Sequence, residues 1–391
     1  MKASDKRILI LNGDSTQAIP MAKSLRSLGY IIDVVAYTRL GYGSNSRYVS
    51  KSFYFAGYKD PDAYYCYLIE ILKSRKYVSV IPCDDYGAIV LSKYKQVFFE
   101  YTRYVAPDFD VFEKGYDKHS LMQLCKERGY PHPQTFIVGE NLNDVDVEKL
   151  PYPLLIKPNH TCGARGMTLV HSETELQEAF PYIYKYFGEC HLQQYIPEGG
   201  HQVEVQLYIG KNNELVQSSV IKKFRWYPEK GGSSCCNVSA INTEIVDTCY
   251  HILLDLGWQG FADFDTIEDP RTGELLILEI NPRIPACVKS AFVSGINWAD
   301  IIIGEYLGKP HSTYTAKEGL YLRHLGFEIL WFFYSKNRFS TRPSWFRFVG
   351  KNVYYQDMSD WTDPLPFFGG TLGNFIKQLS PRFRKSKSGA R

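Results

Sequence analysis

The first hundred residues alternate apolar runs with amphipathic stretches. The apolar runs at 7–12, 31–37 and 77–82 predict strands, and the spacing of apolar positions at 17–28 and 63–73 predicts helices. Strands that alternate with helices in this way are typical of parallel βαβ units in an open, doubly wound sheet. We therefore expect an α/β unit here, with ligands beyond the carboxyl ends of its strands.

The centre of the chain predicts a different arrangement. Residues 114–129 have the pattern of one helix, and from residue 201 the pattern becomes strand-rich and antiparallel. The central part is therefore expected to be α+β. Two of its strands, 261–267 and 275–280, are joined by a Pro- and Gly-containing segment that suits a hairpin turn.

This hairpin carries a candidate metal site. Alternate residues of a strand share one face, so Glu279, Asn281 and Arg283 point the same way. If the turn centres near Thr272, Asp265 lies opposite Glu279. Two carboxylates and an amide oxygen on one face form a hard-oxygen set that suits Mg²⁺. The alternative is an exposed face on which Arg283 neutralises the acids, and the spacing alone leaves both open.

Basic and glycine-containing segments elsewhere suit anions. Lys157 ends an apolar strand, and Gly163 and Gly166 in the next loop would let backbone N–H groups approach phosphate oxygens. Lys223 and Arg225 share a strand face beside a Gly-Gly-Ser turn, which suits an anionic substrate group or a transferring phosphoryl. Each segment is equally consistent with an ordinary surface loop or strand.

An acidic pair follows the strand at 77–82. Asp84 and Asp85 stand at its carboxyl end, where the ligand of a parallel sheet is expected. A pair of acids there suggests that one substrate carries an amine. The alternative is a pair of solvated turn residues.

The composition narrows the class of protein. The chain has 391 residues, 45% of them hydrophobic, and a net charge of +3, which favours a globular protein of several units and argues against bulk nucleic-acid binding. The stretch 329–334 is far too short to span a membrane. Charged residues near the start leave no signal-peptide core, and nine cysteines without a CxxC pair are typical of reduced thiols, so we expect a cytoplasmic protein.

Several motifs follow one another in a specific order along residues 1–310. They are Asp117-Lys118 at a helix start, Lys157 on a strand, the glycine loop at 163–167, the hinge at 193–196 and the hairpin strand at 278–283. In this order and at these separations they resemble the ATP-grasp superfamily, and most of all its carbamoyl-phosphate-synthase-like carboxylate–amine ligases. The resemblance implies a Rossmann-like pre-ATP-grasp domain, a two-lobed ATP-grasp fold and an aromatic-rich C-terminal extension. The expected domains are 1–108 (Rossmann-like), 109–198 (small lobe with the glycine loop), 199–310 (large lobe with the metal-binding hairpin) and 311–391 (extension with a basic tail).

The resemblance also implies cofactors, ATP and Mg²⁺ or Mn²⁺, and a role for each matching residue. The residues implied to bind ATP are Lys118, Lys157, Gly163, Gly166, Met167, Gln193, Gln194, Tyr195, Ile196, Gln202 and Glu204. Those implied to hold the metal are Asp265, Glu279 and Asn281, and those implied to face the transferred phosphoryl and the carboxylate are Arg283 and Arg225. From the patterns above, substrate contacts are expected at Asp84, Asp85, Lys223, Gly232 and Ser233.

The implied activity is ATP- and Mg²⁺-dependent ligation of a small-molecule carboxylate to an amine, on amino-acid-like or peptide-like substrates, through an acylphosphate. One alternative is an ATP-grasp enzyme whose acceptor is a thiol, bicarbonate or ammonia. Another is a nucleotide-binding regulatory protein without turnover. The latter rests on Gln193 and Gln202, which stand where the family commonly has glutamate.

The chain after residue 308 is dense in aromatic residues and ends in a basic tail. Residues 381–391 contain five basic side chains and no acid. The preferred interpretation is an aromatic-rich subdomain with a solvated tail. The alternative is that 327–333, 345–348 and the basic tail form a peripheral patch on an anionic membrane surface.

Overall fold

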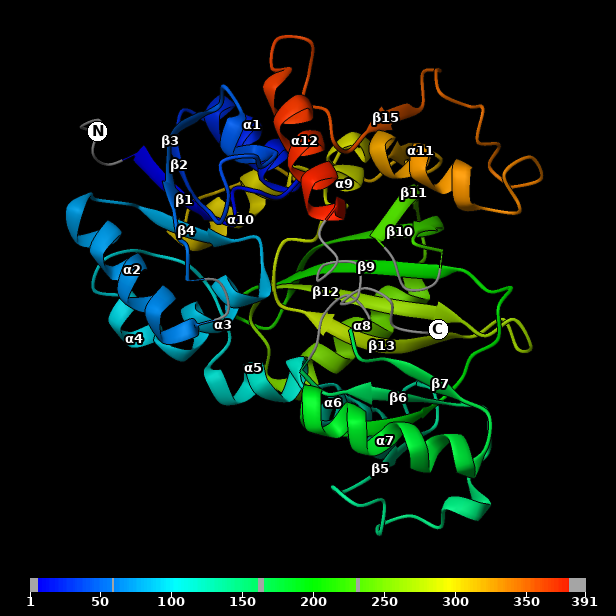
Figure 1. The fold of residues 1–391 in the computed structure, drawn as a ribbon. Coiled ribbons are helices and arrows are strands. Elements are labelled where there is room, and N and C mark those ends of the chain that lie inside the picture. Colours follow the sequence, from blue (N-terminus) through cyan, green and yellow to red (C-terminus); the bar gives the residue numbers. More distant parts are fainter. Residues whose placement is uncertain (1–5, 58–59, 161–164, 230–232, 380–391) are drawn as a thin grey trace.

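The computed structural model describes residues 6–57, 60–160, 165–229 and 233–379, which form three β-sheets with helices packed on them (Figure 1). The first sheet has the strand order β3-β2-β1-β4, and all of its pairings are parallel, which confirms the predicted α/β unit. Within the described ranges no helix is both long enough and apolar enough to cross a bilayer. The elements of this unit are β1 (Arg7–Leu11), α1 (Ala18–Ser27), β2 (Ile31–Ala36), η2 (Gly43–Asn45), β3 (Val49–Tyr54), α2 (Pro61–Ser74), β4 (Ser79–Pro82), α3 (Asp85–Lys93) and α4 (Lys95–Phe98).

The second sheet is antiparallel, with the order β5-β8-β6-β7, and it has an apolar core of its own under helix α7. In Figure 1 it lies beside the largest sheet, with α7 on its outer face. Its elements are β5 (Thr135–Ile137), η3 (Val147–Lys149), β6 (Leu154–Pro158), β7 (Thr168–Val170), α7 (Glu173–Phe187) and β8 (Cys190–Gln194).

The single helix expected over 114–129 is wrong, because the chain forms two helices there, α5 (Phe109–Tyr116) and α6 (Lys118–Arg128). Asp117 lies between them in an extended conformation, and its carboxylate accepts a hydrogen bond from the backbone N–H of Ser120 at 2.8 Å. An Asp at this position satisfies an N–H group that the new helix start would otherwise leave unpaired. The break puts Lys118 in the first turn of α6.

The largest sheet has the order β13-β12-β9-β10-β11-β14-β15. Helix α8 packs against it and supplies much of its apolar core. The described elements are β9 (Gln202–Ile209), β10 (Leu215–Tyr227), β11 (Ser233–Ala240), α8 (Thr243–Leu256), β12 (Gly260–Glu268) and β13 (Leu275–Asn281). The hairpin β12–β13 places Asp265 opposite Glu279, and so the predicted register is confirmed.

The residues after 281 return to both neighbouring units. Helix α10 packs against α1, β14 pairs with β11 to extend the largest sheet, and α12 packs against η2 of the N-terminal unit (Figure 1). The last strand, β15, runs parallel to β14. These elements are α9 (Lys289–Ser294), α10 (Trp298–Leu307), β14 (Tyr321–Arg323), α11 (Leu325–Tyr334), β15 (Val353–Tyr355) and α12 (Leu365–Leu379).

Candidate active site

A pocket of about 470 Å³ lies between the three units. One wall comes from the large sheet, where three neighbouring strands each carry polar residues two positions apart. In register, Asp265 on β12 lies between Glu204 on β9 and Glu279 on β13, and Asp263 is paired with Asn281. The pleat of the sheet thus gathers acids and an amide from three strands on one surface.

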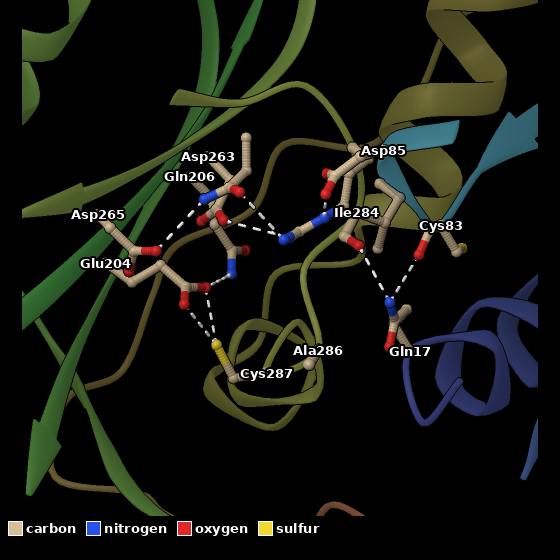
Figure 2. A network of polar contacts seen from close by, with 12 residues as sticks. Gln17, Cys83, Asp85, Glu204, Gln206, Asp263, Asp265, Ile284, Ala286 and Cys287 are labelled. Atoms are coloured by element: carbon tan, nitrogen blue, oxygen red, sulfur yellow. Dashed lines mark hydrogen bonds and ion pairs between the residues drawn. The ribbon is translucent and has the colours of Figure 1, made fainter. Parts of the chain in front are cut away.

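Lys223 neutralises two of these acids. Its Nζ lies 2.5 Å from Oδ1 of Asp265 and 2.9 Å from Oε2 of Glu204. Burial opposes the charge on Lys223, but the carboxylates of Asp265 and Glu204 outweigh it and raise the pKa of the lysine well above its ordinary value. Burial likewise works to raise the pKa of Asp265, yet Lys223 lowers it below its usual range. Glu204 also accepts a hydrogen bond from the thiol of Cys287 (Figure 2).

Arg283 lies at the other end of the acidic surface. Its guanidinium is 3.2 Å from Asp85, 3.6 Å from Asp263 and 3.1 Å from the side-chain oxygen of Asn281. Asp263 is 1% exposed, and its Oδ1 has no hydrogen-bond partner among the described residues. Burial, together with the carboxylates of Glu204 and Asp265, raises the pKa of Asp263 well above its ordinary value.

The opposite wall comes from the small sheet and α6. Nζ of Lys157 donates to the side-chain oxygen of Gln193 at 2.8 Å, across the β6–β8 pairing. Lys118 lies 3.2 Å from Oε2 of Glu279 and so connects this wall to the hairpin. Both lysines are buried in the pocket lining, which also contains apolar side chains such as Leu155.

The pocket contains oxygen donors of the kind that a divalent metal requires. In the part of the chain that the structure describes, no group of three or more His, Cys, Asp or Glu side chains is placed to hold a metal ion. The expected set contains only two carboxylates, Asp265 and Glu279, and a third oxygen from Asn281, whose amide donates to Asp265 at 3.3 Å. The oxygens of Asp265, Glu279 and Asn281 are of the hard type that Mg²⁺ prefers, and a metal site there stays a prediction.

A third wall comes from the N-terminal unit and the last segment of the chain. His324, the residue before α11, lies 3.2 Å from Oδ2 of the fully buried Asp357, and its Nε2 is 3.5 Å from the hydroxyl of Tyr42. That hydroxyl accepts a hydrogen bond from Asn374 of α12 at 2.9 Å. No pattern in the sequence predicts this cluster, because its members are up to 332 positions apart.

Arg225 does not lie in the pocket lining, contrary to the expectation for it. The pairing of β10 with β11 is irregular between Lys223 and Arg225, and the two side chains have separate partners. Arg225 is 2% exposed, and its Nη2 is 2.7 Å from Oε1 of the fully buried Glu328. Arg323 binds the same carboxylate, so the two arginines fasten α11 to the large sheet.

Asp84 and Asp85 are also absent from the pocket lining, contrary to the substrate role expected for them. Asp84 caps α3 by accepting a hydrogen bond from the N–H of Gly87 at 3.0 Å, and it accepts another from the hydroxyl of Tyr37 at 2.6 Å. Asp85 is paired with Arg283. The acids are therefore used within the protein, as a helix cap and as an ion-pair partner.

Most of the other predicted residues do meet in the pocket. Gly163 and Gly232 lie outside the described residues, and Gly166, at φ +74°, contacts Phe187 and Pro158 without entering the lining. The predicted residues that line the pocket are Lys118, Lys157, Met167, Gln193, Gln194, Tyr195, Ile196, Gln202, Glu204, Lys223, Ser233, Asp265, Glu279, Asn281 and Arg283.

Comparison with known proteins agrees with this geometry. Residues 116–287 match the ATP-grasp domain family. The chain is 27% identical to the D-aspartate ligase of Enterococcus faecium (strain Aus0004) over 249 residues, which are 59% of this chain and 58% of that protein. It thus spans a little over half the length of that relative.

Two solved structures have the same fold. One is the biotin carboxylase domain of Hydrogenobacter thermophilus 2-oxoglutarate carboxylase, in complex with MgADP, ADP and bicarbonate, with a TM-score of 0.66 and 17% identity over 81% of this chain and 73% of that one. The other is the L-amino acid ligase from Bacillus licheniformis, with a TM-score of 0.60 and 18% identity over 78% of this chain and 75% of that one. Identities this low establish the fold alone.

Proposed function

We propose that this chain, whose residues 116–287 form an ATP-grasp domain, is an ATP-dependent ligase that joins a small-molecule carboxylate to an amine. The observation that carries the proposal is the grouping of four cationic side chains with the oxygen donors of the hairpin in one pocket. The four are Lys118, Lys157, Lys223 and Arg283.

The charges of the reactants explain why such a grouping is needed. ATP carries about four negative charges near neutral pH, so a carboxylate that approaches its γ-phosphorus is repelled unless those charges are neutralised. Lys118 and Lys157 lie on the wall that we assign to the phosphates, with 193–196 as the strip that receives the adenine. Lys223 and Arg283 lie on the large sheet, where they can hold the incoming carboxylate and the transferred phosphoryl.

The predicted metal has a place in this scheme. Asp265, Glu279 and Asn281 would hold Mg²⁺, which when bound neutralises phosphate charge. In the structure Asp265 is paired with Lys223 and Glu279 with Lys118. These pairs place both lysines beside the carboxylates that we assign to the metal.

The reaction would take place in two balanced steps. A carboxylate oxygen attacks the γ-phosphorus of ATP, and the bond between that phosphorus and the oxygen of the β-phosphate breaks. The products of this step are ADP and an acylphosphate. An amine nitrogen then attacks the acyl carbon, the bond to the phosphate oxygen breaks, and inorganic phosphate leaves as the nitrogen loses a proton.

We place the amine at the third wall of the pocket. Asp14 and His324 line it, and Asp14 supplies a carboxylate for an ammonium group. Nδ1 of His324 faces Asp357, which accepts hydrogen bonds from the backbone N–H groups of Leu325 and Gly326. Nε2 lies 3.5 Å from the hydroxyl of Tyr42, and we assign it the role of accepting the proton of the amine in place of that contact. Phe327 stacks on the ring at 4.0 Å and fixes its orientation.

The test is ADP release by the purified chain with panels of carboxylic acids and amines, with mass detection of the product. Hydroxylamine should trap the acylphosphate as a hydroxamate in the absence of an amine. Lys157→Ala and Glu279→Gln should each lower turnover at least a hundredfold, because each removes a charge at the phosphates. The matched controls Lys211→Ala and Glu274→Gln, at exposed positions, should behave as the unmodified protein.

Three outcomes would contradict the proposal. They are turnover in the Glu279→Gln protein equal to that of the unmodified chain, a thioester product with a thiol acceptor in place of an amide, and tight ATP binding without ADP release for any acid in the panel.

A further inference from the structure

Helix α12 lies on the protein with its glycines inward. Pro366, Gly370 and Gly373 are buried against the loop before η2. A Cβ atom added at Gly370 would lie 2.2 Å from the ring of Tyr42, and one at Gly373 would lie 2.0 Å from the carbonyl oxygen of Leu40. Only residues without a side chain permit an approach this close, so the backbone of α12 itself forms the contact (Figure 1).

The opposite face of α12 is apolar and exposed. At about 100° per residue, its exposed large apolar side chains fall within one arc of about 100°, on the side away from the buried glycines, while Phe367 lies outside this arc and is half-buried. A helix on the surface of a protein normally turns its apolar face inward and its polar face outward, and α12 reverses this arrangement. The side chains of the stripe, with their exposed fractions, are Leu365 63%, Phe368 64%, Leu372 51%, Phe375 62%, Ile376 49% and Leu379 60%.

Charge and aromatic residues flank this stripe. Trp361, just before α12, is fully exposed. Residues 381–391, which lie outside the described residues, follow the helix with five basic side chains and no acid. An apolar stripe beside a tryptophan and a run of cations is the pattern of a helix that lies in the interface of an anionic bilayer. A second copy of the chain has a net charge of +3 and carries the same basic segment, whereas anionic lipid is negative throughout, so we take lipid as the occupant of the stripe.

We propose that α12 docks this protein on an anionic membrane surface, with the stripe from Leu365 to Leu379 in the interface, and that the five basic residues of the sequence after it strengthen the attraction to anionic lipid. A helix of 15 residues is about 22 Å long, which is shorter than the hydrocarbon core of a bilayer. The helix therefore lies on the membrane and does not cross it. This inference is independent of the ligase activity.

The experiment is co-sedimentation of the full chain with vesicles of phosphatidylcholine, with or without phosphatidylglycerol. The chain should sediment with the anionic vesicles only, and added salt should reduce the bound fraction. The variant Phe368→Ser/Leu372→Ser/Phe375→Ser, and separately a chain without residues 381–391, should each bind at least tenfold more weakly.

A matched control is available on α7, where Tyr182 and Tyr186 are 59% and 62% exposed and Phe187 is 37% exposed. Replacing all three by serine should leave vesicle binding unchanged. Quenching of Trp361 fluorescence by brominated lipid, measured against a Trp361→Phe protein, gives a readout that does not depend on the α12 variant folding correctly.

Two results would overturn the proposal. One is the absence of a difference in vesicle binding, in which the unmodified chain and the α12 variant sediment equally with anionic vesicles or neither sediments with them. The other is concentration-dependent self-association that the α12 substitutions abolish while neither protein binds vesicles, which would show that a second copy covers the stripe.

Discussion

Nζ of Lys223 on β10 lies 2.5 Å from Oδ1 of Asp265 on β12, although β9 runs between these two strands. The long lysine side chain reaches across β9 and contacts Glu204 on the way, so one cation serves two acids on two strands. Substituting this single residue therefore tests both the stability and the chemistry of the site.

Lys223→Met should lower the free energy of unfolding by about 3–5 kcal/mol near pH 7, because it leaves Glu204 and Asp265 without their cation. The pKa of Asp265 is lowered in the folded protein, so this contribution is present above the unfolded value of 3.8 and is lost as the pH falls. The difference between the two proteins in urea unfolding should accordingly shrink in acid. Lys222→Met, on the other face of the strand, is the control, and a loss no greater than that of the control would be evidence against the prediction.

Glu328→Gln should destabilise the protein by about 3–5 kcal/mol, since it leaves the buried guanidinium groups of Arg225 and Arg323 without a counter-charge. Asp146→Asn, which breaks the exposed pair with Lys149, should cost less than about 1 kcal/mol. Thermal unfolding measures both. If Arg225 acted on the phosphoryl group, Arg225→Lys would abolish ADP release in a protein of unchanged stability. We expect instead that Arg225→Lys lowers the stability of the protein and that ADP release is retained.

The free energy of unfolding of the Asp84→Asn protein, relative to that of the wild type, should increase as the pH rises from 4 to 7. Burial is the main reason that the pKa of Asp84 is raised from 3.8 to about 6 in the folded protein. The protonation of Asp84 therefore contributes stability that is fully present below pH 3.8 and is lost as the pH rises through about 6. Asparagine still caps a helix, so the variant should gain about 1–3 kcal/mol over the wild type across this window. Urea unfolding at both pH values, with Asp60→Asn at another helix cap as control, would show a flat difference if the idea is wrong.

His324→Gln should raise the KM for the amine at least tenfold and lower kcat, while the KM for ATP stays within about twofold. The imidazole lies on the third wall, which comes from other elements than the proposed phosphate residues, so only the second half-reaction should suffer. The hydroxamate formed with hydroxylamine, which needs little help to lose a proton, should be nearly unaffected. Equal loss of amide and hydroxamate formation would place His324 outside the amine site.

The side of the pocket that we assign to the nucleotide could be predicted from the sequence, because the information there is local. A strand has a period of two, and so Glu279 and Asn281 had to share a face, while the hairpin turn fixed Asp265 opposite Glu279. The motifs around Lys118 and Lys157 likewise lie within short segments whose order is specific.

The position of Arg225 and the third wall of the pocket could not be predicted, because both depend on long-range contacts. Arg225 follows Lys223 by two positions, but an irregular pairing of β10 with β11 and the distant Glu328 send the two side chains to different places. Tyr42, His324 and Asn374 meet only because the chain returns to its beginning, and no spacing in the sequence records that return.

This return has a consequence for synthesis on the ribosome. The N-terminal unit emerges first, yet η2 and the loop before it stay without their covering helix until α12 has left the exit tunnel. A nascent or prematurely terminated chain that stops before residue 365 would have the nucleotide half of the pocket and an open opposite side. Such a fragment would admit water to any acylphosphate that it formed, so in the ligation that we propose the last helix protects the intermediate from hydrolysis.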